Sequence, residues 1–195
     1  MANRVMRMGI AAAAVVALSA PAFAASRPAP ATSQVGQPSG NLQVFRGVQD
    51  KILKYPHFTI FDNVNAQVHD GVVTLTGKVT MPYKQKDIER RVADVTGVQQ
   101  VNNQLEVLPV SQFDDALRLG IARAIYSNPA FQMYGSMVNP PIHAIVDRGH
   151  VTLAGVVLNE ADKMIVNSIA RSSSAFSVTN ELKTEAEVKK DLEKI

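Results

Sequence analysis

An internal repeat is the feature of this sequence that most restricts its fold, because a chain that carries one pattern twice is built from two copies of one structural unit. The repeated segments occur in the same order in both halves: residues 71–79 (GVVTLTGKV) match 149–157 (GHVTLAGVV), and 101–105 (VNNQL) match 178–182 (VTNEL). We therefore expect a first module at residues 41–109 and a second module at 112–185. A unit of this length buries only about 60% of the surface of its unfolded chain, so we expect the two modules to support one another.

Each module contains a predicted β-hairpin in which apolar and polar residues alternate. Asp70-Gly71 is typical of a type I′ turn, and Arg148-Gly149 occupies the same place in the second module. A two-residue turn then places all apolar side chains of each hairpin on one face, through these pairs: Val68 with Val73, Ala66 with Leu75, Val64 with Gly77, Val146 with Val151, Ala144 with Leu153, and Ile142 with Gly155. Because two independent hairpins give one register, the pairing is well supported.

Helical periodicity flanks both hairpins. The first helix of each module is expected at 42–54 and 112–127, and the second at 82–95 and 160–172. In the second helix, the repeat relates Ile88 and Val92 to Ile165 and Ile169. A last strand follows, through residues 101–107 in the first module and 178–182 in the second.

The predicted fold class is α+β: two tandem αββαβ modules, each a three-stranded mixed sheet with two helices on one face. The other face of the first sheet would present Asn65, Gln67, His69, Thr74 and Thr76 to water or to a partner. Residues 186–195 read as a charged tail that forms a short helix.

The N-terminus has the features of a secretory signal peptide. Arg4 and Arg7 precede a short apolar run, and small residues lead to an expected cleavage after Ala24. Residues 25–40 are rich in Pro, Ser and Gly and read as a flexible linker. Cleavage would leave 18 basic against 17 acidic side chains, so general attraction to nucleic acid is not expected. Since the chain has no cysteine, disulfides, thiol catalysis and a lipid-bearing cysteine are excluded.

The modules resemble the BON domain family. The resemblance rests on residues 70–77 (DGVVTLTG) and 92–102 (VADVTGVQQVN) in the first module, and on 149–155 (GHVTLAG), 169–170 and 178–180 in the second. The second module departs from the pattern at Arg148 and Ser174, and a five-residue insertion follows Phe131. A signal peptide with two such domains is similar to the soluble periplasmic osmotic-stress members of the family. The resemblance implies binding to phospholipid surfaces, with envelope-protective or chaperone-like roles.

Catalytic motifs are missing from the sequence: it contains no Gly-x-Ser-x-Gly, no phosphate-binding loop and no His-Glu-x-x-His. None of the four histidines has a counterpart in the other module, and the predicted register makes Asp147 and His150 a surface cross-strand pair. We therefore expect a protein that is not an enzyme and that holds no metal and no cofactor.

Basic side chains cluster around the second helix of the first module, at Lys78, Lys84, Lys86, Arg90 and Arg91. They could contact anionic lipid headgroups, but an ordinary solvated helix face would look the same. A basic side chain near an anionic bilayer contributes about 1 kcal/mol, so charge alone would bind only at roughly millimolar concentration.

The insertion at residues 131–141 (FQMYGSMVNPP) is apolar where a surface loop is usually polar. Gly135 and the two prolines argue against a regular element there. Met133, Tyr134 and Met137 could form an apolar tip that enters the lipid interface. The alternative is that they pack on the protein's own core, as we expect for Phe131.

The sequence thus predicts an exported, non-catalytic protein of the periplasm that contacts anionic phospholipid surfaces and is linked to osmotic or envelope stress. The alternative function is a holdase-like chaperone or protein-interaction adaptor. That function needs an exposed apolar groove, on the open sheet face or between the modules.

Overall fold

The computed structural model describes residues 40–192, and for residues 191 and 192 only the backbone. The predicted signal peptide and all of the linker except Gly40 lie outside the described residues, as do residues 193–195.

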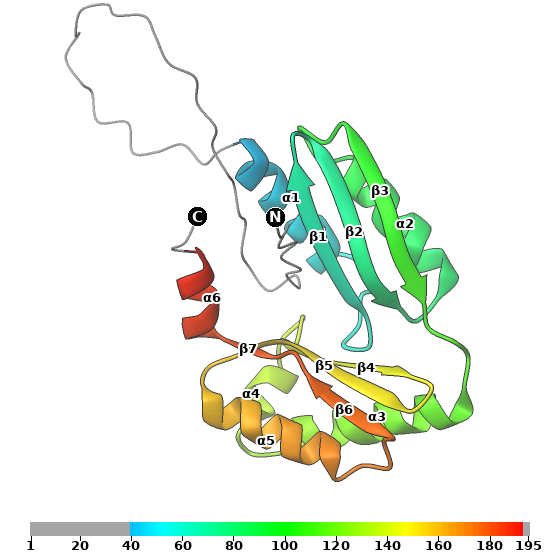
Figure 1. The fold of residues 1–195 in the computed structure, drawn as a ribbon, viewed down its shortest axis with the longest axis vertical. Helices are drawn as coiled ribbons and strands as arrows, with labels where there is room; N and C mark the ends of the chain where they lie inside the picture. Colours follow the sequence, from blue (N-terminus) through cyan, green and yellow to red (C-terminus); the bar gives the residue numbers. More distant parts are fainter. Residues whose placement is uncertain (1–39, 193–195) are drawn as a thin grey trace, which may run out of the picture.

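Two αββαβ modules follow one another along the chain, which confirms the predicted α+β class (Figure 1). The elements of the first module are α1 (Gly40–Leu53), β1 (Asn63–His69), β2 (Val72–Val79), α2 (Pro82–Ala93) and β3 (Gln100–Val107). Those of the second are α3 (Gln112–Tyr126), α4 (Gln132–Gly135), β4 (Ile142–Asp147), β5 (His150–Val157), α5 (Glu160–Arg171), β6 (Ser177–Asn180), β7 (Lys183–Thr184) and α6 (Glu185–Leu192).

Each sheet is mixed, with an antiparallel hairpin and a parallel third strand. The strand orders are β1-β2-β3 and β4-β5-β6, and β7 continues the parallel pairing along β5. All six predicted hairpin pairs are present, so the registers are confirmed. In both modules the two long helices cover one face of the sheet and leave the other face uncovered (Figure 1).

The two hairpin turns use the same left-handed backbone with different residues. Asp70 and Arg148 have φ values of 48° and 50°, and the glycine after each has a φ of 79°. Asp tolerates this region, but Arg seldom adopts it. In the second module the buried carboxylate of Asp114, at the start of α3, accepts hydrogen bonds from the backbone amides of Arg148 (2.9 Å) and Gly149 (2.8 Å). This contact holds the turn in place and lets Arg148 occupy it.

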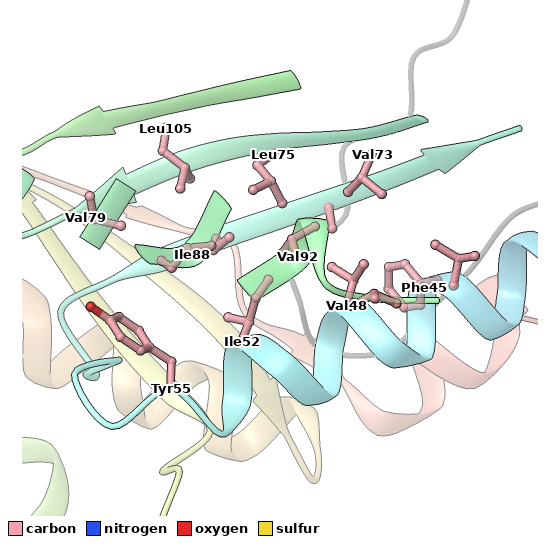
Figure 2. Packing of buried hydrophobic residues seen from close by; sticks show 14 residues of the cluster. Phe45, Val48, Ile52, Tyr55, Val73, Leu75, Val79, Ile88, Val92 and Leu105 are labelled. Carbon is pink, nitrogen blue, oxygen red and sulfur yellow. The ribbon is translucent and has the colours of Figure 1, made fainter. Parts of the chain in front are cut away.

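The first core lies between α1, α2 and the sheet (Figure 2). Val48 and Ile52 of α1 and Ile88 and Val92 of α2 are all fully buried. They pack against the apolar face of the hairpin, where the labelled side chains are Val73, Leu75 and Val79. Burying a Val, Leu or Ile side chain contributes about 1.5–3 kcal/mol, so these contacts dominate the stability of the module.

The second core is built in the same way, except that the predicted correspondence of Ile165 and Ile169 with Ile88 and Val92 was wrong by one residue. Val166 and Ala170 are fully buried, whereas Ile165 is 36% exposed and Ile169 only partly buried. Because Gly77 corresponds to Gly155 in the hairpin register, Ile88 corresponds to Val166. The second module lacks one residue between its second helix and its last strand, and the sequence comparison placed that gap too early.

The charged segment after the second sheet is a helix with a capping box at its start. The Thr184 hydroxyl accepts a hydrogen bond from the Glu187 amide (3.2 Å), and Glu187 accepts one from the Thr184 amide (2.7 Å). Lys163 of α5 bonds the same carboxylate (3.1 Å), and Val188 is buried. The described part of this segment, α6, is therefore docked on the second module.

Two glycines sit where no other residue fits. Gly77 and Gly155 have φ values of 124° and 122°, and an added Cβ would lie 2.1 Å from the Asn63 carbonyl oxygen and 1.8 Å from that of Pro141. We expect Gly77→Ala or Gly155→Ala to lower the free energy of unfolding by about 3 kcal/mol, measured by chemical denaturation.

The matched control is Gly120→Ala in α3, where a Cβ would meet nothing within 4 Å. Since alanine is the better helix former, this change should raise stability by about 0.5–1 kcal/mol. If Gly77→Ala or Gly155→Ala changed the free energy of unfolding as Gly120→Ala does, the backbone conformation described for Gly77 and Gly155 would be contradicted.

Candidate functional site

The basic cluster predicted on α2 does not form one surface. Lys84 is 3% exposed, and its ammonium group bonds the carboxylate of Asp62 at 2.7 Å. Lys84 was therefore wrongly assigned as a lipid contact. It points inward because it continues the buried stripe of α2, four residues before Ile88.

Asp62 is fully buried and uses both carboxylate oxygens. They accept hydrogen bonds from the amides and hydroxyls of Thr59 and Thr80, at 2.7–2.9 Å, in addition to the Lys84 bond. This network joins the segment before β1, the end of β2 and the start of α2. It is a structural polar centre of the first module.

The other basic residues also separate. Lys78 pairs with Asp147 of the second module and with Glu106, and the Arg91 guanidinium stacks 4.8 Å above the Tyr55 ring. Lys86 and Arg90 remain exposed on α2. Two exposed charges cannot hold the protein on a bilayer, since each contributes about 1 kcal/mol.

Some side chains of the insertion at residues 131–141 are buried in the second core, and others are exposed. Phe131 is fully buried, as expected, and Tyr134 is 7% exposed and stacks on it with ring centroids 6.1 Å apart. Tyr134 was therefore wrongly assigned to an exposed tip. Met133 is 64% exposed and Met137 44% exposed, as a surface tip requires. The expectation of no regular element was also wrong, because residues 132–135 form the single-turn helix α4.

An apolar surface that the sequence reading missed lies on the outward side of α3 and α5. These helices lie side by side beneath the second sheet and face away from the first module (Figure 1). Leu119 is 57% exposed and Met164 64% exposed, and they lie among small exposed residues and Ile165. The members of this surface, which we call the outer helix face, are Ala116, Leu119, Gly120, Ala124, Ala161, Met164, Ile165 and Ser168.

The first module has a different outer helix face. Its exposed residues on α1 and α2 are mainly charged or polar: Gln43, Arg46, Asp50, Lys51, Lys86, Glu89 and Arg90. Because the two modules share one fold, this difference does not follow from the architecture. The apolar residues Leu119 and Met164 were a signal in the sequence, but the repeat matched Ile165 to Ile88, which is buried.

An exposed aromatic pair flanks the β4–β5 turn. Phe113 and Phe176 are 45% and 73% exposed, and their rings stack at 5.7 Å. The Phe176 ring covers Gly149 and meets the His150 ring edge-on. This pair adds exposed apolar area to the second module alone, since Gly71 of the first module has Gln99 as its neighbour instead.

The modules contact each other through the start of β4. The amide of Ala144 donates to the Ile60 carbonyl (2.9 Å), and the Asn139 side chain donates to the Leu53 carbonyl (3.0 Å). His143 Nδ1 lies 2.7 Å from the Asp62 carbonyl oxygen, so this nitrogen carries the proton. Burial lowers the pKa of His143, and the hydrogen bond to the Asp62 carbonyl opposes this effect. The contact between the two modules therefore favours the neutral form of His143.

Beside this contact lies a cleft of about 760 Å³ between the uncovered faces of the two sheets. Its walls are largely polar: they carry Asn63, Asn65, Thr76, Gln104, Thr152 and the charged residues Lys78, Glu106, Glu181, Lys183 and Glu187. Apolar side chains are the minority of this lining, among them Phe58, Ile145, Ala154 and Leu182. Among the described residues, no three His, Asp or Glu side chains converge as a metal site would require.

Comparison with known families assigns both modules. The family model described as "BON domain" matches residues 46–109 and 130–186. The chain belongs to the BON domain family. It carries two BON domains in tandem, and BON domains are associated with phospholipid binding and with non-enzymatic roles at the cell envelope. Within residues 40–192, no helix has the length and apolar character needed to span a bilayer.

Solved structures similar to this BON protein include two of CdsD, a structural protein of the type III secretion system of Chlamydia trachomatis. The CdsD C-terminal domain is 14% identical over 82% of this chain and 71% of that chain, with a TM-score of 0.30. The second is 12% identical over 75% of this chain and 96% of that chain, with a TM-score of 0.26. Likeness at this level does not bear on function. No curated protein sequence matches the chain.

Substitution of Lys84 tests its structural role. Lys84→Met would leave Asp62 charged and buried without its cation, so we expect a loss of about 3–5 kcal/mol in the free energy of unfolding. Lys86→Met, two residues along the same helix, changes an exposed side chain and should alter stability by no more than about 0.5 kcal/mol. An unchanged stability for Lys84→Met would show that this side chain is not buried with Asp62.

Acidification tests the contact at His143. An unfolded histidine has a pKa of about 6.5, and burial depresses the folded value. The contribution of neutral His143 is therefore present above that pH and is lost as pH falls. We expect the stability lost between about pH 8 and about pH 5 to be smaller in His143→Gln, because glutamine keeps a donor for the Asp62 carbonyl without titrating. An identical loss in both proteins would mean that other groups cause it.

Proposed function

We propose that this protein is an exported, non-catalytic BON protein of the periplasm that contacts anionic phospholipid surfaces through its second module. The observation that carries this proposal is the outer helix face of α3 and α5, which is apolar where that of the first module is charged. Soluble proteins seldom expose large apolar patches without a partner. The family's association with phospholipid supports a membrane surface as that partner.

The energetics of such a contact predict weak but measurable binding. The exposed parts of Leu119, Met164 and Ile165 would each contribute about 1 kcal/mol when they enter the lipid interface. The exposed cations Arg123 and Arg171, which lie on the same sides of α3 and α5, would each add about 1 kcal/mol near anionic headgroups. A total of about 5 kcal/mol corresponds to a dissociation constant on the order of 200 µM.

A role in osmotic or envelope stress belongs to this proposal and follows from the resemblance to soluble periplasmic members of the family. The predicted signal peptide supports export.

The alternative, a holdase-like chaperone, requires an apolar groove for unfolded clients. The polar walls of the cleft between the sheets favour the lipid surface over this alternative.

Vesicle co-sedimentation of the chain from residue 25 tests the proposal. We expect binding to anionic vesicles, weaker binding at high salt because the cationic contribution is screened, and little binding to zwitterionic vesicles. The variant Leu119→Gln/Met164→Gln/Ile165→Gln should bind at least about tenfold more weakly, since it removes about 3 kcal/mol of apolar contact.

The matched control changes three exposed residues of the other outer face, Lys51→Gln/Lys86→Gln/Arg90→Gln, and should bind within about twofold of the unaltered protein. Loss of binding in this control alone would move the contact to the first module. Absence of binding to any vesicle, together with suppression of client aggregation in lipid-free solution, would replace the lipid proposal with the chaperone.

A further inference from the structure

The cleft between the uncovered faces of the two sheets has no part in the proposed function. Its volume of about 760 Å³ falls within the range of about 300–1,000 Å³ that is typical of small-molecule sites. The proposed lipid contact uses α3 and α5, which lie on the other face of the second sheet (Figure 1). A ligand in the cleft would therefore not compete with a membrane surface.

The wall that the first module contributes is a regular grid of polar side chains. Residues on the open face of β1, β2 and β3 lie opposite one another in the sheet register, and two such rows line the cleft. One row is Asn63, Lys78 and Glu106, and the other, which we call the neutral row, is Asn65, Thr76 and Gln104. The neutral row carries no charge and offers amide and hydroxyl groups that both donate and accept hydrogen bonds.

The wall that the second module contributes carries an apolar strip. Ile145 and Ala154 line the cleft and are only 4% and 6% exposed. The Phe58 ring of the first module packs against the His143 ring at 5.5 Å between centroids, and His143 lies opposite Ala154 in the register. Thr152, opposite Ile145, adds a hydroxyl. The cleft therefore offers hydrogen-bonding groups on one wall and mainly apolar surface on the other.

The charges of the cleft do not suit an anionic ligand. Among the described residues, Lys78 and Lys183 are the lysines that line it. Lys78 forms ion pairs with Asp147 and Glu106, and Lys183 is engaged in an interaction of its own. Phosphates and carboxylates are usually held by free Arg or Lys side chains. Since Glu181 also lines the cleft, a phosphate or a carboxylate would meet repulsion there.

One acceptor of the neutral row has no hydrogen bond. Asn65 Oδ1 is shielded from water, and no donor of the described residues reaches it. A buried acceptor without a donor is unfavourable, so a folded protein that contains one commonly lacks a partner at that place. Because Asn65 lines the cleft, a ligand hydroxyl is a suitable donor for it.

We propose that this cleft binds a short, uncharged oligosaccharide, whose hydroxyl groups bond to the neutral row and whose C–H faces lie on the apolar strip. A pyranose ring carries hydroxyl groups around its rim and C–H groups on its two faces, so it presents both kinds of surface at once. Each sugar hydroxyl donates and accepts, as the groups of the neutral row do. The inference does not rest on the proposed lipid contact.

An NMR titration of the isotope-labelled chain from residue 25 tests the inference, with maltotriose, cellotriose and N-acetylated chitotriose as the probes. At least one of these sugars should shift the amide signals of Thr76, Gln104, Thr152 and Ala154, and leave those of the outer helix face unchanged. Glycerol phosphate, a fragment of a phospholipid headgroup, should cause no shifts, because both lysines of the cleft are engaged.

The decisive variant is Thr76→Ala/Gln104→Ala, which removes two hydrogen-bonding groups of the neutral row and should weaken sugar binding at least about tenfold. The matched control is Thr74→Ala/Asn102→Ala. It makes a similar change on the same two strands, in the next row of the open face, outside the residues that line the cleft. The control should bind sugar within about twofold of the unaltered protein.

A second variant separates a binding role from a structural one. Asn65→Ala removes an acceptor that has no donor in the free protein, so the melting temperature should not fall. Sugar binding should nevertheless weaken at least about threefold, because the ligand loses one hydrogen bond. A fall in melting temperature with unchanged sugar binding would show that Asn65 serves the fold and would contradict its role in the cleft.

The inference is overturned if none of the three sugars causes shifts at concentrations up to about 10 mM. Equal weakening in the variant and the matched control, or tighter binding of glycerol phosphate than of the sugars, would overturn it as well. Vesicle binding is measured separately: Thr76→Ala/Gln104→Ala should retain it, and Leu119→Gln/Met164→Gln/Ile165→Gln should lose it but still bind the sugar. Failure of either proposal therefore leaves the other testable by its own assay.

Discussion

The antiparallel hairpin is the constraint on which each module depends. Its left-handed turn and the close approach of the chain at Gly77 and Gly155 admit one register only. Once that register is set, alternate side chains point to opposite faces of the sheet. Two helices then cover the apolar face, and the polar face is left open. The cleft between the modules is where the two open faces meet.

The two modules share this fold but stabilise it through different contacts. In the first, Asp62, Thr80 and Lys84 form a buried polar network at the junction of β2 and α2. In the hairpin register, Thr80 and Lys84 correspond to Leu158 and Asp162, so the second module cannot form it. It fills the same region with the insertion after Phe131, whose buried aromatic rings pack beside the start of α5. A polar centre has been replaced by an apolar one, and this replacement leaves Leu158 and the methionines of the insertion at the surface.

Divergence between the copies also accounts for the surface on which the functional proposal rests. The repeat leaves the outer helix faces free to differ, because these residues do not contribute to either core. The first module presents charge there, which suits water, and the second presents Leu119, Met164 and small residues. The second module presents the apolar surface, while the first supplies carbonyl acceptors to β4 and the cationic partner of Asp147.

The sequence by itself determined the repeat, the α+β class and both hairpin registers, because these depend on local turn chemistry and on the periodicity of apolar residues. The resemblance to BON domains came from motifs such as residues 70–77 and 92–102. It could not determine which basic residues are exposed. Lys84 looks like its neighbour Lys86, and only the packing of α2 against the sheet places one beside Asp62 and the other in water. It also matched Ile165 to Ile88, although Val166 takes that buried place, because an alignment error of one residue along a helix exchanges a core position for a surface position. The apolar outer helix face was decided by tertiary structure, because the exposure of a side chain depends on where its helix packs, and the residue type alone does not determine that.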